Sequence, residues 1–239
     1  QQHAITSNQM NKRKDKKNKM ANNKEQAPLT IEGVSKTEAF FDKYKKALIY
    51  GIVAVIVIIA GVIVYNTYVA GPREDKASTL LAKGQDYYAQ GQFDKALKGD
   101  GNYLGFVTIA SDYSGTDAGN LANLYAGLCY AQTGKWTEAA QYLEKYSPAD
   151  DQMVSPAAQG ALGNAYANLK QYDKAVETLK KAAKMADNNS LSPTFLIQAG
   201  EILESQGKKE EALKLYQQVK ADYVNSMAYQ TIDKYIERA

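Results

Sequence analysis

The sequence has very little of the side-chain chemistry on which most enzymes and metal sites depend. Among 239 residues it has one histidine, His3, and one cysteine, Cys129. A single cysteine cannot form an internal disulfide. A single histidine near the N-terminus leaves the long C-terminal part without a His-based catalytic triad or a His-rich metal site. Because its neighbours include Leu124, Leu128 and Tyr130, Cys129 is expected to be a buried, unreactive thiol.

Short catalytic motifs are absent as well. The long C-terminal part has no glycine-rich phosphate loop, zinc-binding His-Glu-x-x-His helix, Cys-x-x-Cys pair or Gly-x-Ser-x-Gly turn. The carboxylate pairs Asp150-Asp151 and Glu210-Glu211 are typical of solvated surfaces. Asp100 lacks the other acidic ligands of a calcium loop. The sequence therefore predicts a protein that is not an enzyme and that uses no cofactor or metal.

Charge is unevenly distributed along the chain. Residues 1–46 contain eleven Lys/Arg and five Asp/Glu, whereas residues 47–239 contain eighteen basic and twenty-one acidic residues. The slightly acidic C-terminal part has no stripe of basic and aromatic residues, so no nucleic-acid partner is expected. The basic stretch 11–19 could bind nucleic acid, but a disordered tail is the favoured interpretation. Met10 and Met20 are alternative start residues, so residues 1–19 could lie outside the translated protein.

Residues 47–72 contain no charged side chain, and the first eighteen of them are almost wholly apolar. Since about 20 apolar helical residues cross the hydrocarbon layer of a bilayer, this stretch predicts one transmembrane helix over 47–69. A basic, disordered tail is expected over 1–35 and an amphipathic juxtamembrane segment over 36–46. The basic residues place the tail in the cytoplasm and residues 73–239 outside it.

A cleaved signal peptide is the main alternative to this anchor. Its apolar region would have about 7–15 residues and would be followed by small residues at a cleavage site. Here the apolar run is longer, follows 46 residues, and has Tyr68 where a small residue should precede Ala70. No cysteine follows the run at a position that lipoprotein processing would need. An uncleaved anchor is therefore favoured.

A pattern of glycine, aromatic and alanine residues recurs after the apolar run. Four copies begin at Gly84, Gly127, Gly163 and Gly200. An aromatic residue follows three positions later in the first three copies, at Tyr87, Tyr130 and Tyr166. An alanine follows twelve positions later in all four, at Ala96, Ala139, Ala175 and Ala212. The stretches between copies have apolar residues at helical spacing, so each copy predicts a pair of helices.

This pattern resembles the tetratricopeptide repeat, a helix–turn–helix unit of 34 residues. The resemblance covers about residues 76–226 and implies an all-α fold, an α-solenoid of about four repeats. The glycines would let the two helices of a unit approach closely, the tyrosines would fill the gaps between units, and the alanines would mark the tightest helix contacts. Residues 227–239 would form a C-terminal capping helix, with Tyr229, Ile232 and Ile236 facing inward.

Departures from the repeat are visible in units one and three. The segment between Ala96 and Phe106 interrupts the second helix of unit one, and a bulge or kink is expected there. Lys170 replaces a turn glycine in unit three, which predicts a mild cost in stability. Ahead of the repeats, at Gly71-Pro72, the apolar helix is expected to end and a new helix to begin.

In the family, ligands contact the first helices of the repeats, which line a concave groove. Carried over position by position, this implies a groove with an apolar middle, flanking amides and an acidic end. Its candidate residues are Gln85, Tyr88, Leu121, Leu124, Leu128, Gln132, Asn164, Asn168, Glu201 and Glu204. The groove has no Lys or Arg, so a clamp for a carboxylate is not expected. An unfolded or extended polypeptide is the expected ligand, although the leucines could instead pack within the chain.

The order of basic tail, span and repeat domain resembles the inner-membrane ancillary subunit of the bacterial Sec translocon. The resemblance implies a single-pass protein of the bacterial inner membrane with a periplasmic domain. Its partners would be translocon subunits and a periplasmic folding factor, and its role that of a non-catalytic adaptor or chaperone-like subunit. The alternative is a scaffold for another envelope assembly, in outer-membrane biogenesis or cell-wall synthesis.

Overall fold

A computed structural model describes residues 31–239, and most side chains from Phe40 onward. The tail expected over residues 1–35 therefore lies almost entirely outside the described residues. Residues 31–239 form helices and connecting segments, with no strand among them. The chain divides into two units between Ile63 and Val64, and each unit is described by itself.

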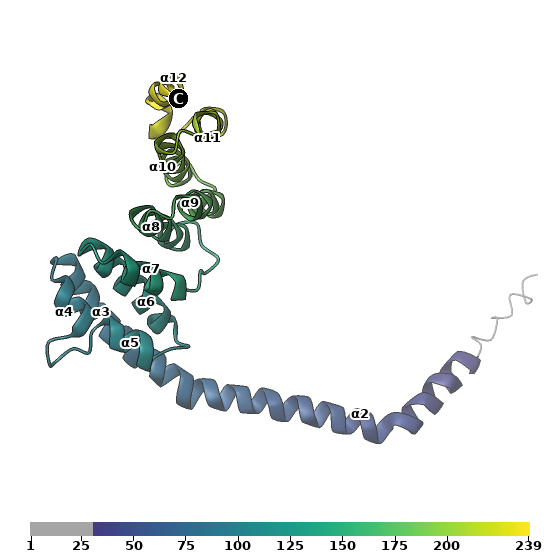
Figure 1. The fold of residues 1–239 in the computed structure, drawn as a ribbon. Helices are drawn as coiled ribbons and strands as arrows, with labels where there is room; N and C mark the ends of the chain where they lie inside the picture. The colour runs from purple at the N-terminus through teal and green to yellow at the C-terminus, as the bar shows by residue number, and fades with distance from the viewer. Residues whose placement is uncertain (1–30) are drawn as a thin grey trace, which may run out of the picture. The chain divides into compact units, whose positions relative to one another are not determined.

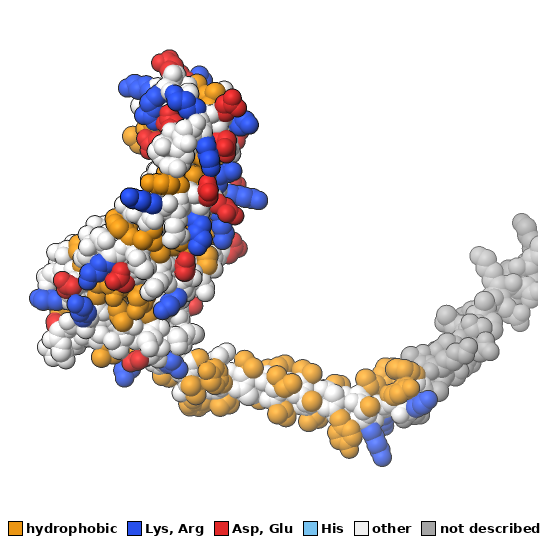
Figure 2. Space-filling model, viewed as in Figure 1, with side chains coloured by type: hydrophobic (Ala, Val, Ile, Leu, Met, Phe, Trp, Pro, Cys, Tyr) orange, Lys and Arg blue, Asp and Glu red, His pale blue; other side chains and the backbone are white. Residues whose placement is uncertain are grey.

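The first unit contains most of α2, which runs from Ile31 to Tyr65. Its large apolar side chains are exposed, Ile56 and Ile58 among them. Figure 2 shows hydrophobic side chains along this helix. The helical run that contains it has an 18-residue window with a mean hydropathy of 3.1, none of which is buried inside the protein. In length and composition this helix can cross a membrane.

The chain stays helical at Gly71-Pro72, where the sequence predicted a break. A five-residue π-helix, η1 (Asn66–Ala70), follows α2 and leads directly into α3 (Gly71–Ala89). The Gly71 N–H donates to the Asn66 carbonyl, which closes the wider π turn. Pro72 then falls in the first turn of α3, where its missing N–H is tolerated. The predicted helix start is therefore right, and the predicted end of the preceding helix is wrong.

The part of the chain from Val64 onward is a succession of helix pairs, which Figure 1 shows from α3 onward. Below, units one to four are the four repeats. Each pair corresponds to one copy of the sequence pattern. Unit one pairs α3 with the divided α4 (Phe93–Lys98) and α5 (Phe106–Asp112), and unit two pairs α6 (Asp117–Gln132) with α7 (Trp136–Lys145). Unit three pairs α8 (Val154–Asn168) with α9 (Tyr172–Ala186), and unit four pairs α10 (Ser192–Ser205) with α11 (Lys209–Asp222). The predicted all-α solenoid of four repeats is confirmed.

The leading glycines allow the two helices of a unit to touch, as the sequence predicted. A Cβ atom at Gly163 would lie 2.7 Å from Leu179 Cγ, and one at Gly127 would lie 2.6 Å from Leu143 Cγ. In both units the partner side chain comes sixteen residues after the glycine. The four repeat alanines have no exposed surface: Ala96, Ala139, Ala175 and Ala212.

The interruption in unit one is a loop of residues 99–105, which separates α4 from α5, so it is larger than a bulge. Gly99 and Gly105 have φ angles of +86° and +83°. Side chains there would meet backbone atoms at 1.9 and 2.3 Å, so the two ends of the loop lie close together. Phe106 then contacts Gly84, taking the place that Leu143 and Leu179 have in later units. The extra residues of the loop therefore leave the contact between the two helices of unit one at the same repeat position, Gly84.

The turn of unit three is strained at Lys170. Its φ is +60°, close to the values of +71°, +72° and +74° at the turn glycines Gly91, Gly134 and Gly207. Because a side chain is unfavourable in this left-handed region, Lys170 costs about 1 kcal/mol relative to glycine. The predicted cost of this substitution has a clear structural cause.

The repeat tyrosines fill gaps, but mostly within their own units. Tyr87 packs on Tyr103 with ring centroids 5.6 Å apart, and Tyr130 stacks on Tyr142 at 5.4 Å. In contrast, the Tyr166 hydroxyl donates to Glu144 at 2.5 Å and so links unit three to unit two. The prediction that these side chains lie between units is therefore only partly right.

The predicted buried thiol is confirmed. Cys129 has no exposed surface, and burial raises its pKa to about 12. The thiol therefore stays protonated at neutral pH and is unreactive.

The cap consists of a short 3₁₀ helix, η2 (Met227–Gln230), and α12 (Ile232–Arg238). Ile232 is fully buried, and Ile236 is partly buried against the unit-four core, as predicted. Tyr229 is 39% exposed, so its predicted inward position is wrong. It lies in the 3₁₀ segment, which has a tighter turn than the single α-helix assumed in the prediction.

Two adjacent residues at the start of α3 fasten this helix, Glu74 to the next unit and Arg73 to the second part of its own unit. The Glu74 carboxylate accepts hydrogen bonds from the backbone N–H groups of Asp117 (2.7 Å) and Ala118 (2.9 Å) at the start of α6. Arg73 donates to the Asp112 carbonyl at 2.6 Å, at the end of α5. Glu74 thereby supplies the negative charge that a helix N-terminus favours.

We expect Glu74→Ala to destabilise the domain by about 1 kcal/mol, because it leaves two N-terminal N–H groups of α6 without their acceptor. Thermal melts of the full chain in detergent measure the loss. Asp75→Ala is the matched control, since the exposed Asp75 is the next acid on the same helix, and it should change stability by at most about 0.5 kcal/mol. Equal melting temperatures for the two variants would show that this helix cap contributes nothing.

Candidate functional site

The apolar middle of the predicted groove belongs largely to the core of the stack. Leu124 is 6% exposed and lies in a buried cluster with Leu143 and Leu162. Leu121 and Leu128 are partly buried and pack against the same cluster. The prediction that Leu124 lies open to a ligand is therefore wrong.

The reason is visible at the equivalent position of unit three, Gly160. A Cβ atom there would lie 2.3 Å from Cε1 of Phe195, which belongs to unit four. This position of the first helix therefore faces the next unit and cannot face a ligand. Leu124 occupies the same position in unit two, so its burial follows from the stacking of units.

Tyr88 and Gln132 come together from units one and two. Tyr88 makes edge-to-face contacts with Phe93 and Tyr125, each with ring centroids 5.5 Å apart. Burial raises the pKa of Tyr88, and the nearby Gln132 side chain opposes this shift. Gln132 itself is exposed. This end of the predicted groove therefore presents an amide beside a partly buried aromatic cluster.

The amides of unit three keep their predicted places on one helix. Asn168 is exposed, and its side-chain N–H donates to the Asn164 carbonyl at 2.8 Å. Asn164 is partly buried, as is Gln85 of unit one. The side-chain carbonyl oxygen of Asn168 and the second N–H of its amide have no partner in the described part of the chain. Both can reach the backbone of a bound peptide.

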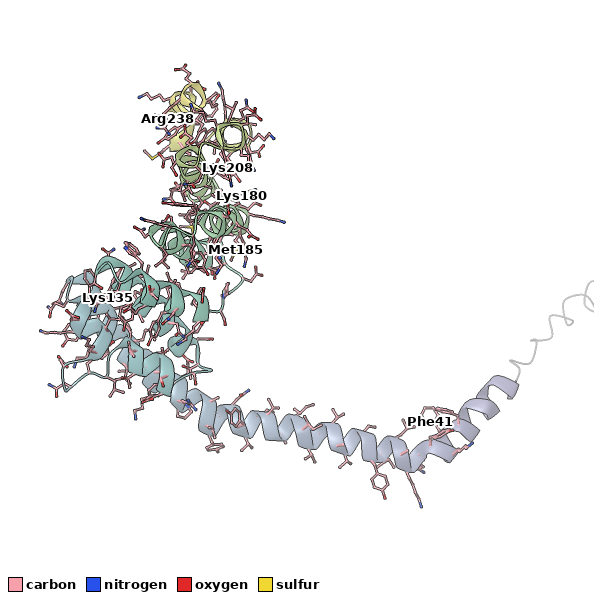
Figure 3. All side chains as sticks on the ribbon, viewed as in Figure 1. Phe41, Lys135, Lys180, Met185, Lys208 and Arg238 are labelled. Atoms are coloured by element: carbon pink, nitrogen blue, oxygen red, sulfur yellow. The ribbon has the colours of Figure 1, made fainter. Side chains whose placement is uncertain are left out.

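The acidic end of the predicted groove is occupied by the C-terminal cap. Arg238 of α12, labelled in Figure 3, pairs with Glu204 at 2.5 Å and lies 4.0 Å from Glu201. The Tyr216 hydroxyl donates to Glu204 at 2.8 Å. The hydrogen bond from Arg238 lowers the pKa of Glu204, and the bond from Tyr216 contributes to this shift.

Sequence reasoning missed this arrangement because Arg238 lies outside the repeats. Its only signal was a basic residue near the end of the capping segment, 34 positions after Glu204. Glu204 is therefore a structural partner of the cap, whereas Glu201 remains exposed.

The depressed pKa of Glu204 predicts acid-sensitive stability. Its carboxylate stabilises the fold above the unfolded pKa of about 4.5, and this contribution is lost as the pH falls below that value. Glu204→Gln should therefore lower the melting temperature at pH 7, and the difference from the natural protein should shrink below about pH 4.5. Glu201→Gln, at the longer 4.0 Å contact, is the control and should have a smaller effect. A difference that stays constant from neutral pH down to about pH 3 would contradict this role.

Comparison with known proteins agrees with the geometry of the stack. A putative kinesin light chain from Podosopora anserina, with nearly identical TPR-like repeats, aligns with a TM-score of 0.53 and 15% identity. The alignment covers 69% of this chain and 85% of that one, and a second structure of that protein matches equally well. At this identity the likeness shows the fold alone. No curated protein matches the sequence.

A family model described as a tetratricopeptide repeat-like domain matches residues 38–234. The match includes every helix pair described above and most of the apolar helix. The repeat fold generally serves as a non-catalytic scaffold for protein interaction. This chain belongs to the tetratricopeptide repeat-like domain family.

Proposed function

We propose that this protein is a membrane-anchored adaptor that binds other proteins and has no catalytic activity. The observation that carries the proposal is the apolar window of α2, which is exposed along its whole length in a chain that also forms a repeat scaffold. Exposing eighteen such residues to water is strongly unfavourable, whereas a bilayer covers them at no cost.

The residues at both ends of this window support a membrane position. Tyr44 and Tyr50 lie near one end and Tyr65 and Tyr68 near the other, and all four are at least 41% exposed. Tyrosines are enriched at the two membrane surfaces. The lysines just before the apolar run favour a cytoplasmic N-terminus: Lys43, Lys45 and Lys46. We therefore assign residues 36–46 to the juxtamembrane segment, 47–69 to the span and 73–239 to a periplasmic domain.

The remaining concave surface is the proposed protein-binding site. It presents the amides of Gln85, Gln132, Asn164 and Asn168, while Leu128 contributes a partly exposed apolar side chain. Amides one turn apart on α8 can satisfy the backbone of an extended polypeptide, which otherwise loses hydrogen bonds when it leaves water. With Leu124 buried, we expect this surface to bind mainly through polar contacts.

We propose that the partners belong to the protein-export translocon of the bacterial inner membrane, together with a membrane-tethered periplasmic folding factor. The order of basic tail, single span and repeat domain supports this assignment. A scaffold of outer-membrane biogenesis or cell-wall synthesis could have the same order, so the partner distinguishes the two functions.

The proposed topology predicts the activity of a fused reporter. Alkaline phosphatase, which is active only after export, should be active when it is joined after Ala239, because the span places the repeat domain outside. A fusion that ends at Lys46 retains the basic tail without the span and should be inactive. Activity of the second fusion, or inactivity of the first, would contradict the assigned orientation.

The partner is identified by site-specific photo-cross-linking in intact cells. A photoreactive residue at Asn168, on the exposed concave surface, should give cross-links to translocon subunits or their export clients. The control position is Gln217, which is exposed on α11. Cell-wall or outer-membrane assembly proteins at Asn168 would favour the scaffold function. Identical cross-links from both positions would show that the concave surface is not the binding site.

A further inference from the structure

A basic hollow lies at the turns of units three and four, and its lining begins two residues after Asn168. Its volume is about 420 Å³. Its lining comes from the turn between α8 and α9, from the start of α9, and from the turn between α10 and α11. The lining residues are Lys170, Gln171, Tyr172, Asp173, Lys174, Gln206 and Lys208.

Positive charge exceeds negative charge in this hollow. Lys208, labelled in Figure 3, pairs with Asp173 at 2.9 Å and so neutralises the one carboxylate in the lining. Lys170 and Lys174 form no ion pair with any residue that the structure describes. The Lys174 ammonium lies 4.9 Å from the centre of the Tyr166 ring, and this contact holds it beside the turn. Two ammonium groups therefore remain to attract an anion.

The first turn of α9 contributes backbone N–H groups and the carboxylate of Asp173 to this part of the surface. Its N-cap residue, Gln171, makes no side-chain capping hydrogen bond. Uncapped N–H groups at a helix start carry partial positive charge and favour anions. The hollow thus combines charged side chains with polar backbone groups.

Lys170 occupies the turn position at a cost that the other three units avoid. Gly91, Gly134 and Gly207 have glycine at this position with nearly the same backbone angles. Residues held in sparsely populated conformations concentrate where a protein uses them for binding. The extra lysine lies in the unit whose turn borders the hollow.

We propose that this hollow binds an acidic segment of a protein partner through its carboxylates. The inference deepens the proposed function, on which it rests, because it names a second contact surface and the chemistry of the segment that it takes. The candidate residues of the concave surface include amides and the exposed Glu201 but no basic side chain. An acidic segment of a partner therefore binds more favourably at the lysines of the hollow than on the concave surface. Side-chain carboxylates spaced along an extended segment can pair with both free lysines.

The test adds an oligoglutamate peptide to the full chain in nonionic detergent at low salt and follows a fluorophore attached at Ser205→Cys, beside the hollow, so that binding to the basic tail is not read; the buried Cys129 is not labelled. Lys170→Gly should weaken binding about threefold, because it removes one exposed ion pair. It should also raise the melting temperature by a few degrees, since it relieves the strained backbone. Weaker binding by a more stable protein separates a binding role from a folding role. Lys174→Gln should weaken binding to a similar extent without this gain in stability.

Lys180→Gln is the matched control, because Lys180 is exposed on the same helix outside the hollow. It should change the affinity by less than about 1.5-fold, and the same peptide with glutamines should not bind. Equal losses for Lys170→Gly and Lys180→Gln would overturn the proposal, since they would show general attraction to a basic surface. Unchanged affinity in Lys170→Gly and Lys174→Gln would overturn it too. A photoreactive residue at Gln132, on the exposed concave surface of unit two, reads that surface apart from the hollow, so a failure of the hollow is distinguishable from a failure of the adaptor function.

Discussion

The repeat domain depends on one steric constraint, the contact between the two helices of each unit at a residue without a side chain. At Gly163 the neighbouring Leu179 occupies the space that a Cβ atom would need, and at Gly127 Leu143 does the same. This contact fixes the distance between the helices of a pair. The pair then offers a flat face to the next unit, which covers it with residues such as Phe195. One unit alone would leave these faces in water, so the helix pairs become stable only as a stack.

Much of this architecture was accessible from the sequence because its causes are local. Spacing between glycine, aromatic and alanine residues identified the four helix pairs, the interruption in unit one and the buried Ile232. The use of each helix face was harder to predict. Whether Leu124 faces a groove or the next unit depends on the rotation between units, which local spacing does not encode. The continuous helix at Gly71-Pro72 also escaped prediction, because a π turn can absorb a proline that usually ends a helix.

The candidate site shows the same division between local and distant causes. The amides Asn164 and Asn168 stay together because one helix positions both. Glu204 was predicted to lie on the open surface, yet Arg238 and Tyr216 bind it from two other helices. Such a contact across 34 residues leaves no periodic trace in the sequence. The contact between Glu204 and Arg238 covers the end of the last unit with polar groups, and the buried Ile232 covers it with an apolar one. Terminal units of repeat proteins need such a cover because no further unit follows them.

The loop of unit one determines where the surface of this repeat domain can change. Gly99 and Gly105 bring its ends together, and a hydrogen bond from the Asp100 N–H to the Tyr103 carbonyl at 3.2 Å closes it from within. Phe106 and the buried loop residue Tyr103 both pack at Gly84, and the Tyr103 hydroxyl donates to the Ala96 carbonyl at 3.2 Å. Gly101 at the loop surface has open space around it. The stack therefore fixes the inner side of this loop through Tyr103, whereas side chains can change at its tip around Gly101, and a new specificity can arise there while the scaffold stays unchanged.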